Sequence, residues 1–267
     1  MSAAPAAHDV WDVGAGYEAY IGRWSRRVAR EVVGWLGVGP HARWLDVGCG
    51  TGALGDAIAA QAAPALVVGL DRSMGFVAHA HARAGGAHAA FVVADAQALP
   101  VRDGAFDAVT SALVLNFVAD PAQMVAELAR AARPGAPVAL YVWDYADGME
   151  YIRRFWDAAR ALDPAAAALD EAVRFPVCAP GPLAALLEGA GLASVEVRPV
   201  EVPTVFRDFA ECWAPFLAGQ GPAPAYAMAL PEDRRAALRV AFRAALPVSA
   251  DGTIPLRARA WAARGLR

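Results

Sequence analysis

The chain has 267 residues, of which 57% are hydrophobic and 19% charged, so it can bury a sizeable core and is not expected to be disordered. Its net charge of -3 gives no overall attraction to nucleic acid, and no uncharged apolar run of about 18 residues predicts a membrane-spanning helix. No signal peptide is visible, and the three cysteines have neither metal nor disulfide spacing; these features predict a cytoplasmic protein with no metal site.

The first predicted element is an amphipathic helix over residues 17–36, with tyrosine, tryptophan and valine at helical spacing. Its start, Tyr17-Glu-Ala-Tyr-Ile-Gly-Arg-Trp-Ser-Arg26, is unusually aromatic for a surface helix. These rings either pack on the sheet domain or contribute to a binding site. A cation beside aromatic rings can also hold an acidic substrate.

The stretch Trp44-Leu-Asp-Val-Gly-Cys-Gly-Thr-Gly52 predicts a buried strand, a glycine turn and the start of a helix. Backbone amides in such a turn can approach a ligand closely. The spacing from Gly50 to Gly55 also fits the dinucleotide fingerprint, so a nicotinamide cofactor stays open on spacing alone. Asp46 favours S-adenosylmethionine, because a carboxylate suits an ammonium and a sulfonium but not a pyrophosphate.

Further apolar strands are predicted at residues 67–71, 90–95 and 106–112, and two of them end in an acid. Asp71 lies about 20 residues beyond the glycines, where a ribose diol needs an acceptor. Asp95 could accept a hydrogen bond from an adenine amino group. Parallel strands would bring Asp46, Asp71 and Asp95 to one rim of the sheet, where ligands bind in such folds.

With these motifs, residues 40–145 resemble the class I S-adenosylmethionine-dependent methyltransferases. The likeness is strongest to the small-molecule, type 11 subgroup that includes the ubiquinone and menaquinone biosynthesis enzymes. It implies an α/β fold: a Rossmann-like, doubly wound, seven-stranded sheet, mostly parallel, with an antiparallel closing hairpin and a helical cap. It also implies S-adenosyl-L-methionine as the cofactor.

The resemblance implies further contacts with the methyl donor. An N-terminal helix folds over the donor in similar enzymes, which makes Tyr20 and Arg23 candidate donor contacts and Trp24 a candidate substrate contact. The remaining predicted donor contacts are Asp46, Gly48, Cys49, Gly50, Gly52, Asp71, Arg72, Met74, Asp95, Ala96 and Ala112.

Candidate substrate residues follow the fourth and fifth predicted strands. Similar enzymes often place a histidine or arginine at the position of Asn116. An amide does not titrate, so Asn116 is not expected to act as a general base. It could orient a substrate by hydrogen bonds or be an ordinary loop residue. Asp144 and Tyr145 follow the fifth strand, 137–143, on the same rim. With no histidine at an obvious rim position, catalysis by proximity alone or with help from Tyr20 or Asp144 is expected.

Beyond the fifth strand, two aromatic helical inserts are expected to form a cap around a sixth strand at 194–200 and a last strand at 253–262. The predicted domain organisation is a lid helix (1–36), a donor-binding core (37–147), a cap insert (148–178), a core helix and strand (179–203), a second cap insert (204–247) and a closing strand (248–267).

These features predict methyl transfer from S-adenosylmethionine to a small, apolar or aromatic molecule by in-line displacement. An RNA or protein methyltransferase and a non-catalytic S-adenosylmethionine-binding protein remain alternatives, with a nicotinamide oxidoreductase behind them. The predicted partner is a small-molecule substrate, without nucleic acid or membrane. Either a monomer or a homodimer fits the sequence.

Overall fold

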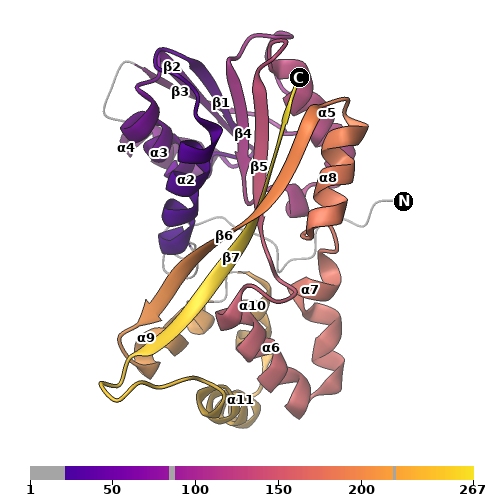
Figure 1. Ribbon diagram of the computed structural model, residues 1–267. Helices are drawn as coiled ribbons and strands as arrows, with labels where there is room; N and C mark the ends of the chain where they lie inside the picture. The colour runs from indigo at the N-terminus through magenta and orange to yellow at the C-terminus, as the bar shows by residue number, and fades with distance from the viewer. Residues whose placement is uncertain (1–21, 84–87, 219–220) are drawn as a thin grey trace.

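A computed structural model describes residues 22–83, 88–218 and 221–267, which form one seven-stranded sheet with helices on both faces (Figure 1). The strand order is β3-β2-β1-β4-β5-β7-β6; β1 to β5 are parallel, and β7 is antiparallel to both of its neighbours. This order confirms the predicted Rossmann-like sheet with its closing hairpin. The strands are β1 (Arg43–Val47), β2 (Leu66–Asp71), β3 (Ala89–Val93), β4 (Ala108–Ala112), β5 (Pro137–Trp143), β6 (Ala193–Phe206) and β7 (Ile254–Leu266).

The central parallel strands are apolar runs because helices cover both faces of this part of the sheet. Strands β1, β4 and β5 are buried along nearly their whole length. Helices α2, α3 and α4 gather on one side, and α5 and α8 on the other (Figure 1). Their bounds are α2 (Arg23–Leu36), α3 (Ala53–Ala62), α4 (Met74–Arg83), α5 (Pro121–Ala131) and α8 (Pro180–Gly189), and a short 3-10 helix, η3 (Leu115–Phe117), follows β4.

Strands β6 and β7 form a hairpin that extends well beyond the parallel sheet (Figure 1). Residues Pro137–Trp143 of β5 pair with the last residues of β7. In the outer half of the hairpin, β7 therefore pairs with β6 alone. Both strands are longer than the sequence predicted. Strand β6 contains Pro199 and Pro203, which an edge strand tolerates, and it lies at the edge of the sheet.

The outer end of the hairpin carries the predicted helical cap (Figure 1). Its elements are α6 (Glu150–Leu162), η4 (Pro164–Leu169), α7 (Glu171–Arg174), α9 (Phe209–Trp213), η5 (Ala214–Ala218), α10 (Pro222–Ala229) and α11 (Glu232–Ala244). Both predicted inserts contribute to one buried aromatic core. The ring of Phe216 stacks on Phe155 with centroids 4.3 Å apart and on Tyr151 at 4.7 Å. The cap therefore has a hydrophobic core of its own.

In the part of the chain that the structure describes, every helix is too short or too polar to cross a membrane. The predicted domain boundary at residue 203 falls inside the continuous strand β6. The lid expected over residues 1–36 is described only from Gly22 onward, and Tyr20 lies outside the described residues.

Candidate functional site

The loop between β1 and α3 is built on three glycines in the left-handed region, with φ values of 73° at Gly48, 51° at Gly50 and 89° at Gly52. Side chains rarely adopt this conformation, which explains why glycine occupies all three positions. Their surroundings differ. A Cβ at Gly48 would lie 2.1 Å from Cγ2 of Val114, whereas a Cβ at Gly50 would meet nothing within 4 Å. Gly48 therefore allows close packing, and Gly50 borders open space that a ligand can enter.

Asp46 is a buried acid at the carboxyl end of β1. The residue is only 1% exposed, and neither carboxylate oxygen has a hydrogen-bond partner among the residues that the structure describes. Burial, reinforced by the nearby charge of Asp71, raises the pKa of Asp46 to about 7. The nearby N–H of Gly55 lowers the pKa of Asp46 by a smaller amount. It is not placed well enough to form a hydrogen bond with the carboxylate. An unpartnered buried carboxylate is costly, so this site favours a cationic ligand group.

Asp71, at the carboxyl end of β2, organises the glycine loop. Its carboxylate accepts hydrogen bonds from the N–H of Gly50 at 2.9 Å and from that of Ser73 at 2.8 Å. Burial nevertheless raises its pKa above the ordinary value. Each oxygen keeps a second lone pair, so a ribose diol can still be accepted. The buried thiol of Cys49 also has a raised pKa because of burial, so it is no nucleophile.

The other predicted donor contacts lie along the same rim. Met74 begins α4 and is 74% exposed, which leaves its thioether open to a planar ligand. Arg72 beside it is also exposed. Asp95 follows β3, and its carboxylate accepts a hydrogen bond from the N–H of Gln97 at 2.9 Å. Ala96 and Ala112 are half-buried, after β3 and at the end of β4.

Arg23 and Trp24 connect α2 to the cap. The guanidinium of Arg23 pairs with Glu211 of α9 at 2.6 Å and lies 4.8 Å from the ring of Phe206. Its Nε and second terminal nitrogen are buried without a hydrogen-bond partner. Trp24 is 3% exposed and contacts Tyr151 and Phe206 edge-on. Trp24 is thus a core residue of the cap, and its predicted contact with substrate has no support from this geometry.

The stretch after β4 links the glycine loop to an aromatic wall. Leu113 has a φ of 61°, a strained conformation typical of functional sites. Val114, next to it, fills the space in front of Gly48. Asn116 is 9% exposed, and its Nδ2 has no hydrogen-bond partner. Phe117 contacts Phe175 edge-on with centroids 5.2 Å apart.

Tyr145 belongs to the same wall. It follows β5, is 4% exposed and lies 5.7 Å from Phe175, ring centroid to ring centroid. The guanidinium of Arg174 lies 5.0 Å from the Phe175 ring. Phe117 and Phe175 were not among the residues predicted for the site. Residues 174–178 follow no regular helical or strand pattern. No local signal shows that this segment reaches the rim.

Asp144 is bound by an arginine of the hairpin. Its Oδ2 accepts from Nε and a terminal nitrogen of Arg259, both at 2.6 Å, and its Oδ1 accepts from the N–H of Asp147 at 3.2 Å. The carboxylate side chain is 3% exposed. A carboxylate engaged in this way is a poor proton acceptor, so the predicted catalytic role of Asp144 has no support in this geometry. Its ion pair with Arg259 instead holds the turn that carries Tyr145 against β7.

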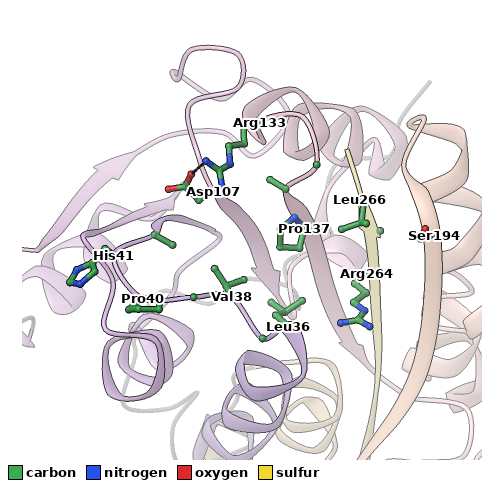
Figure 2. Close-up of a pocket in the computed structure, with 16 residues that line it drawn as sticks. Leu36, Val38, Pro40, His41, Asp107, Arg133, Pro137, Ser194, Arg264 and Leu266 are labelled. Carbon is green, nitrogen blue, oxygen red and sulfur yellow. Dashed lines mark ion pairs between the residues drawn. The ribbon is translucent and has the colours of Figure 1, made fainter.

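A depression of about 610 Å³ lies at the opposite, amino ends of the parallel strands (Figure 2). Figure 2 shows Pro137 in the middle of its lining and the ion pair between Arg133 and Asp107 above it, at 2.8 Å. Arg264, also in the lining, is paired with Glu196 at 2.9 Å. Ligands of such sheets bind at the carboxyl ends, so the rim with Asp46 is the candidate site despite the size of this depression.

Comparison with known proteins shows what the part of the chain around the site is similar to. Residues 45–140 match a family model described as a methyltransferase domain. The chain is 40% identical over 95 residues to a ubiquinone biosynthesis O-methyltransferase of Methylococcus capsulatus, covering 35% of this chain and 40% of the relative. It is 38% identical over 111 residues to a demethylmenaquinone methyltransferase of Renibacterium salmoninarum, covering 42% and 45%. The chain thus spans less than half the length of these curated relatives.

The fold comparison agrees over a longer stretch. The crystal structure of the YcgJ protein of Bacillus subtilis superposes with a TM-score of 0.60 at 18% identity, covering 92% of this chain and 98% of that protein. At this identity the likeness concerns the fold alone.

Proposed function

We propose that this chain is a class I S-adenosylmethionine-dependent methyltransferase, which transfers a methyl group from S-adenosylmethionine to a small molecule. One observation carries the proposal beyond the family match. The rim holds a buried carboxylate, Asp46, without any hydrogen-bond partner, beside a glycine loop that is open at Gly50. A cationic, phosphate-free ligand satisfies both features.

S-adenosylmethionine, when bound, supplies a methyl group that is already activated by the adjacent sulfonium. The residues of this chain would then bind and orient. Asp46 neutralises the ammonium end of the donor, Asp71 accepts from the ribose hydroxyls, and Asp95 accepts from the adenine amino group while Met74 covers its face. The amides of the glycine loop approach the donor at Gly50.

We assign the cap to the acceptor. Its aromatic core makes it a rigid body attached to the rim through the hairpin, through Arg23 and through Trp24. The aromatic wall of Phe117, Tyr145 and Phe175 favours a small molecule with an apolar or aromatic body. Excluding water from the reacting groups is then a task of the cap.

Paired glycine variants test the donor site. Gly50 and Gly37 both have a left-handed backbone, with φ values of 51° and 60°, and both border open space. Gly37 ends α2 at the opposite end of the sheet. Alanine at either position should cost stability to a similar extent, about 1 kcal/mol. Only Gly50→Ala should weaken binding of S-adenosylhomocysteine in a calorimetric titration, since only there does the new methyl group meet the ligand.

NADH serves as the control ligand in the same titration. Binding of S-adenosylhomocysteine and not NADH supports the proposal. If NADH binds instead, or if Gly50→Ala and Gly37→Ala leave equal affinities, the loop does not hold the methyl donor.

A further inference from the structure

We propose that the methyl acceptor is an oxyanion, a carboxylate or an acidic phenolate on an apolar body, and that its charged oxygen accepts a hydrogen bond from Nδ2 of Asn116. The inference rests on the proposed function, because it names the substrate class of the same site. It starts from an amide N–H₂ that is buried and has no hydrogen-bond partner within residues 22–83, 88–218 and 221–267.

Asn116 lies between the donor loop and the aromatic wall. Two residues before it, Val114 packs in front of Gly48; one residue after it, Phe117 contacts Phe175. The strained Leu113 fixes the direction in which this stretch leaves β4. The side chain of Asn116 is therefore placed where a methyl donor and an acceptor would meet. A buried amide N–H₂ without a partner is costly, and a ligand oxygen removes that cost.

The surroundings favour a negatively charged oxygen over an amine. Hydrogen bonds from an amide to an ionised acceptor are roughly twice as strong as bonds to a neutral one. The guanidinium of Arg174, 5.0 Å from the Phe175 ring, adds positive potential to the aromatic wall. An ammonium group is itself a positively charged donor, so both the amide N–H₂ and this guanidinium would repel it. The wall itself accommodates the apolar body of the acceptor.

An oxyanion also fits the state of Asp144. That carboxylate is held bidentately by Arg259, so it is not available to remove a proton from the acceptor. An oxygen that is already ionised has no proton to lose. Its lone pair forms the new oxygen–methyl bond as the sulfur–methyl bond breaks, sulfur keeps that electron pair, and no proton moves.

The experiment compares probes of matched shape on the protein saturated with S-adenosylhomocysteine at pH 8. Phenylacetate, 4-nitrophenolate and phenethylamine are titrated by calorimetry into the wild type, Asn116→Leu and Asn116→Asp. We expect an oxyanion to bind the wild type more tightly than the amine does. Asn116→Leu should raise the Kd of that oxyanion by roughly ten- to a hundredfold. Asn116→Asp should invert the preference, which a merely structural defect would not do.

A second readout is the chemistry of the product. With methyl-labelled S-adenosylmethionine, label that mild alkali releases as methanol identifies a carboxylate acceptor, and alkali-stable label on a phenol identifies a phenolate. Binding or methylation of the amine in preference to both oxyanions overturns the inference, as does an unchanged preference in Asn116→Asp. Failure of S-adenosylhomocysteine to bind the wild type would instead refute the proposed function itself.

Discussion

Replacing Asp46 by asparagine should stabilise the folded protein while weakening donor binding. Asp46 has no hydrogen-bond partner for either carboxylate oxygen, and its pKa rises from 3.8 to about 7. At 1.36 kcal/mol for each pH unit, the charged form costs the folded state about 4 kcal/mol at pH 8. Asparagine removes the charge but keeps unpartnered polar atoms, so we expect a gain of about 2 kcal/mol, or roughly 4–8 °C in Tm.

The pH dependence gives the prediction its sign. The unfolded carboxyl loses its proton near pH 4, whereas the folded one keeps it to about pH 7. Between these values the folded state binds more protons, so the free energy of unfolding contributed by Asp46 falls as pH rises. Thermal unfolding at pH 5, 6, 7 and 8 should therefore show a small difference between Asp46→Asn and wild type at pH 5. The difference should grow toward pH 8.

Binding of S-adenosylhomocysteine should respond in the opposite direction. In the wild type the ligand ammonium needs the charged carboxylate, so Kd should rise about fivefold between pH 7 and pH 6. Asp46→Asn should bind roughly ten- to a hundredfold more weakly at pH 8, with little dependence on pH over this window. Calorimetry in two buffers of different ionisation enthalpy should detect proton release on binding only in the wild type.

Asp56→Asn is the matched control. Asp56 makes a surface ion pair with Arg83 at 2.9 Å, and its side chain is 49% exposed. The same acid-to-amide exchange there should change stability by no more than about 0.5 kcal/mol and leave binding unaltered. If Asp46→Asn behaves like Asp56→Asn in both assays, Asp46 is not an unpartnered carboxylate at the donor site and the reasoning is refuted.

Three further variants separate the rim from the cap. Asp144→Asn should lower stability in denaturant unfolding by about 2–3 kcal/mol, because Arg259 loses its close buried carboxylate and keeps only the longer contact with Glu201 at 3.7 Å, yet it should leave the Kd of S-adenosylhomocysteine unchanged. Phe216→Ala should cost about 3–5 kcal/mol by opening a cavity in the aromatic core, with the donor affinity again intact. Burial raises the pKa of Glu171 to about 7. The free energy of unfolding of Glu171→Gln should therefore increase relative to that of the wild type as pH rises from about 5 to 7. If the difference in unfolding free energy stays constant across that range, Glu171 is not a buried carboxyl that becomes charged.

Much of the fold was predictable because its determinants are local. Short apolar runs that alternate with helices specify a parallel sheet, and the glycines after β1 mark the turn that begins α3. The sequence Asp120-Pro-Ala-Gln123 has the residues of a helix start, and α5 begins there, with the Asp120 carboxylate accepting from the N–H of Gln123 at 3.0 Å. The length of β6 was not predictable in this way. Whether Pro199 and Pro203 end a strand depends on its place at the sheet edge, which is a property of the whole topology.

The candidate site also has a part that could be predicted from local sequence and a part that could not. Asp46, Gly50 and Asp71 were found because a strand, its turn and the next strand are close in sequence. The state of Asp144 was not, because its partner Arg259 lies 115 residues away on β7. The hydrophobic and polar alternation of β7 indicates which side chains point outward, but it does not name the strand that they reach.

Donor and acceptor specificity are consequently encoded in different ways. The proposed donor site consists of turns at the ends of neighbouring parallel strands, and these turns are fixed by backbone conformation. The acceptor wall draws Phe117, Tyr145 and Phe175 from three segments, and the turn under Tyr145 is fastened by the hairpin that also carries the cap. The two sides meet at residues 113–117. Substitutions in the wall or cap can therefore change the acceptor while the donor loop stays intact, and a change in residues 113–117 should affect both.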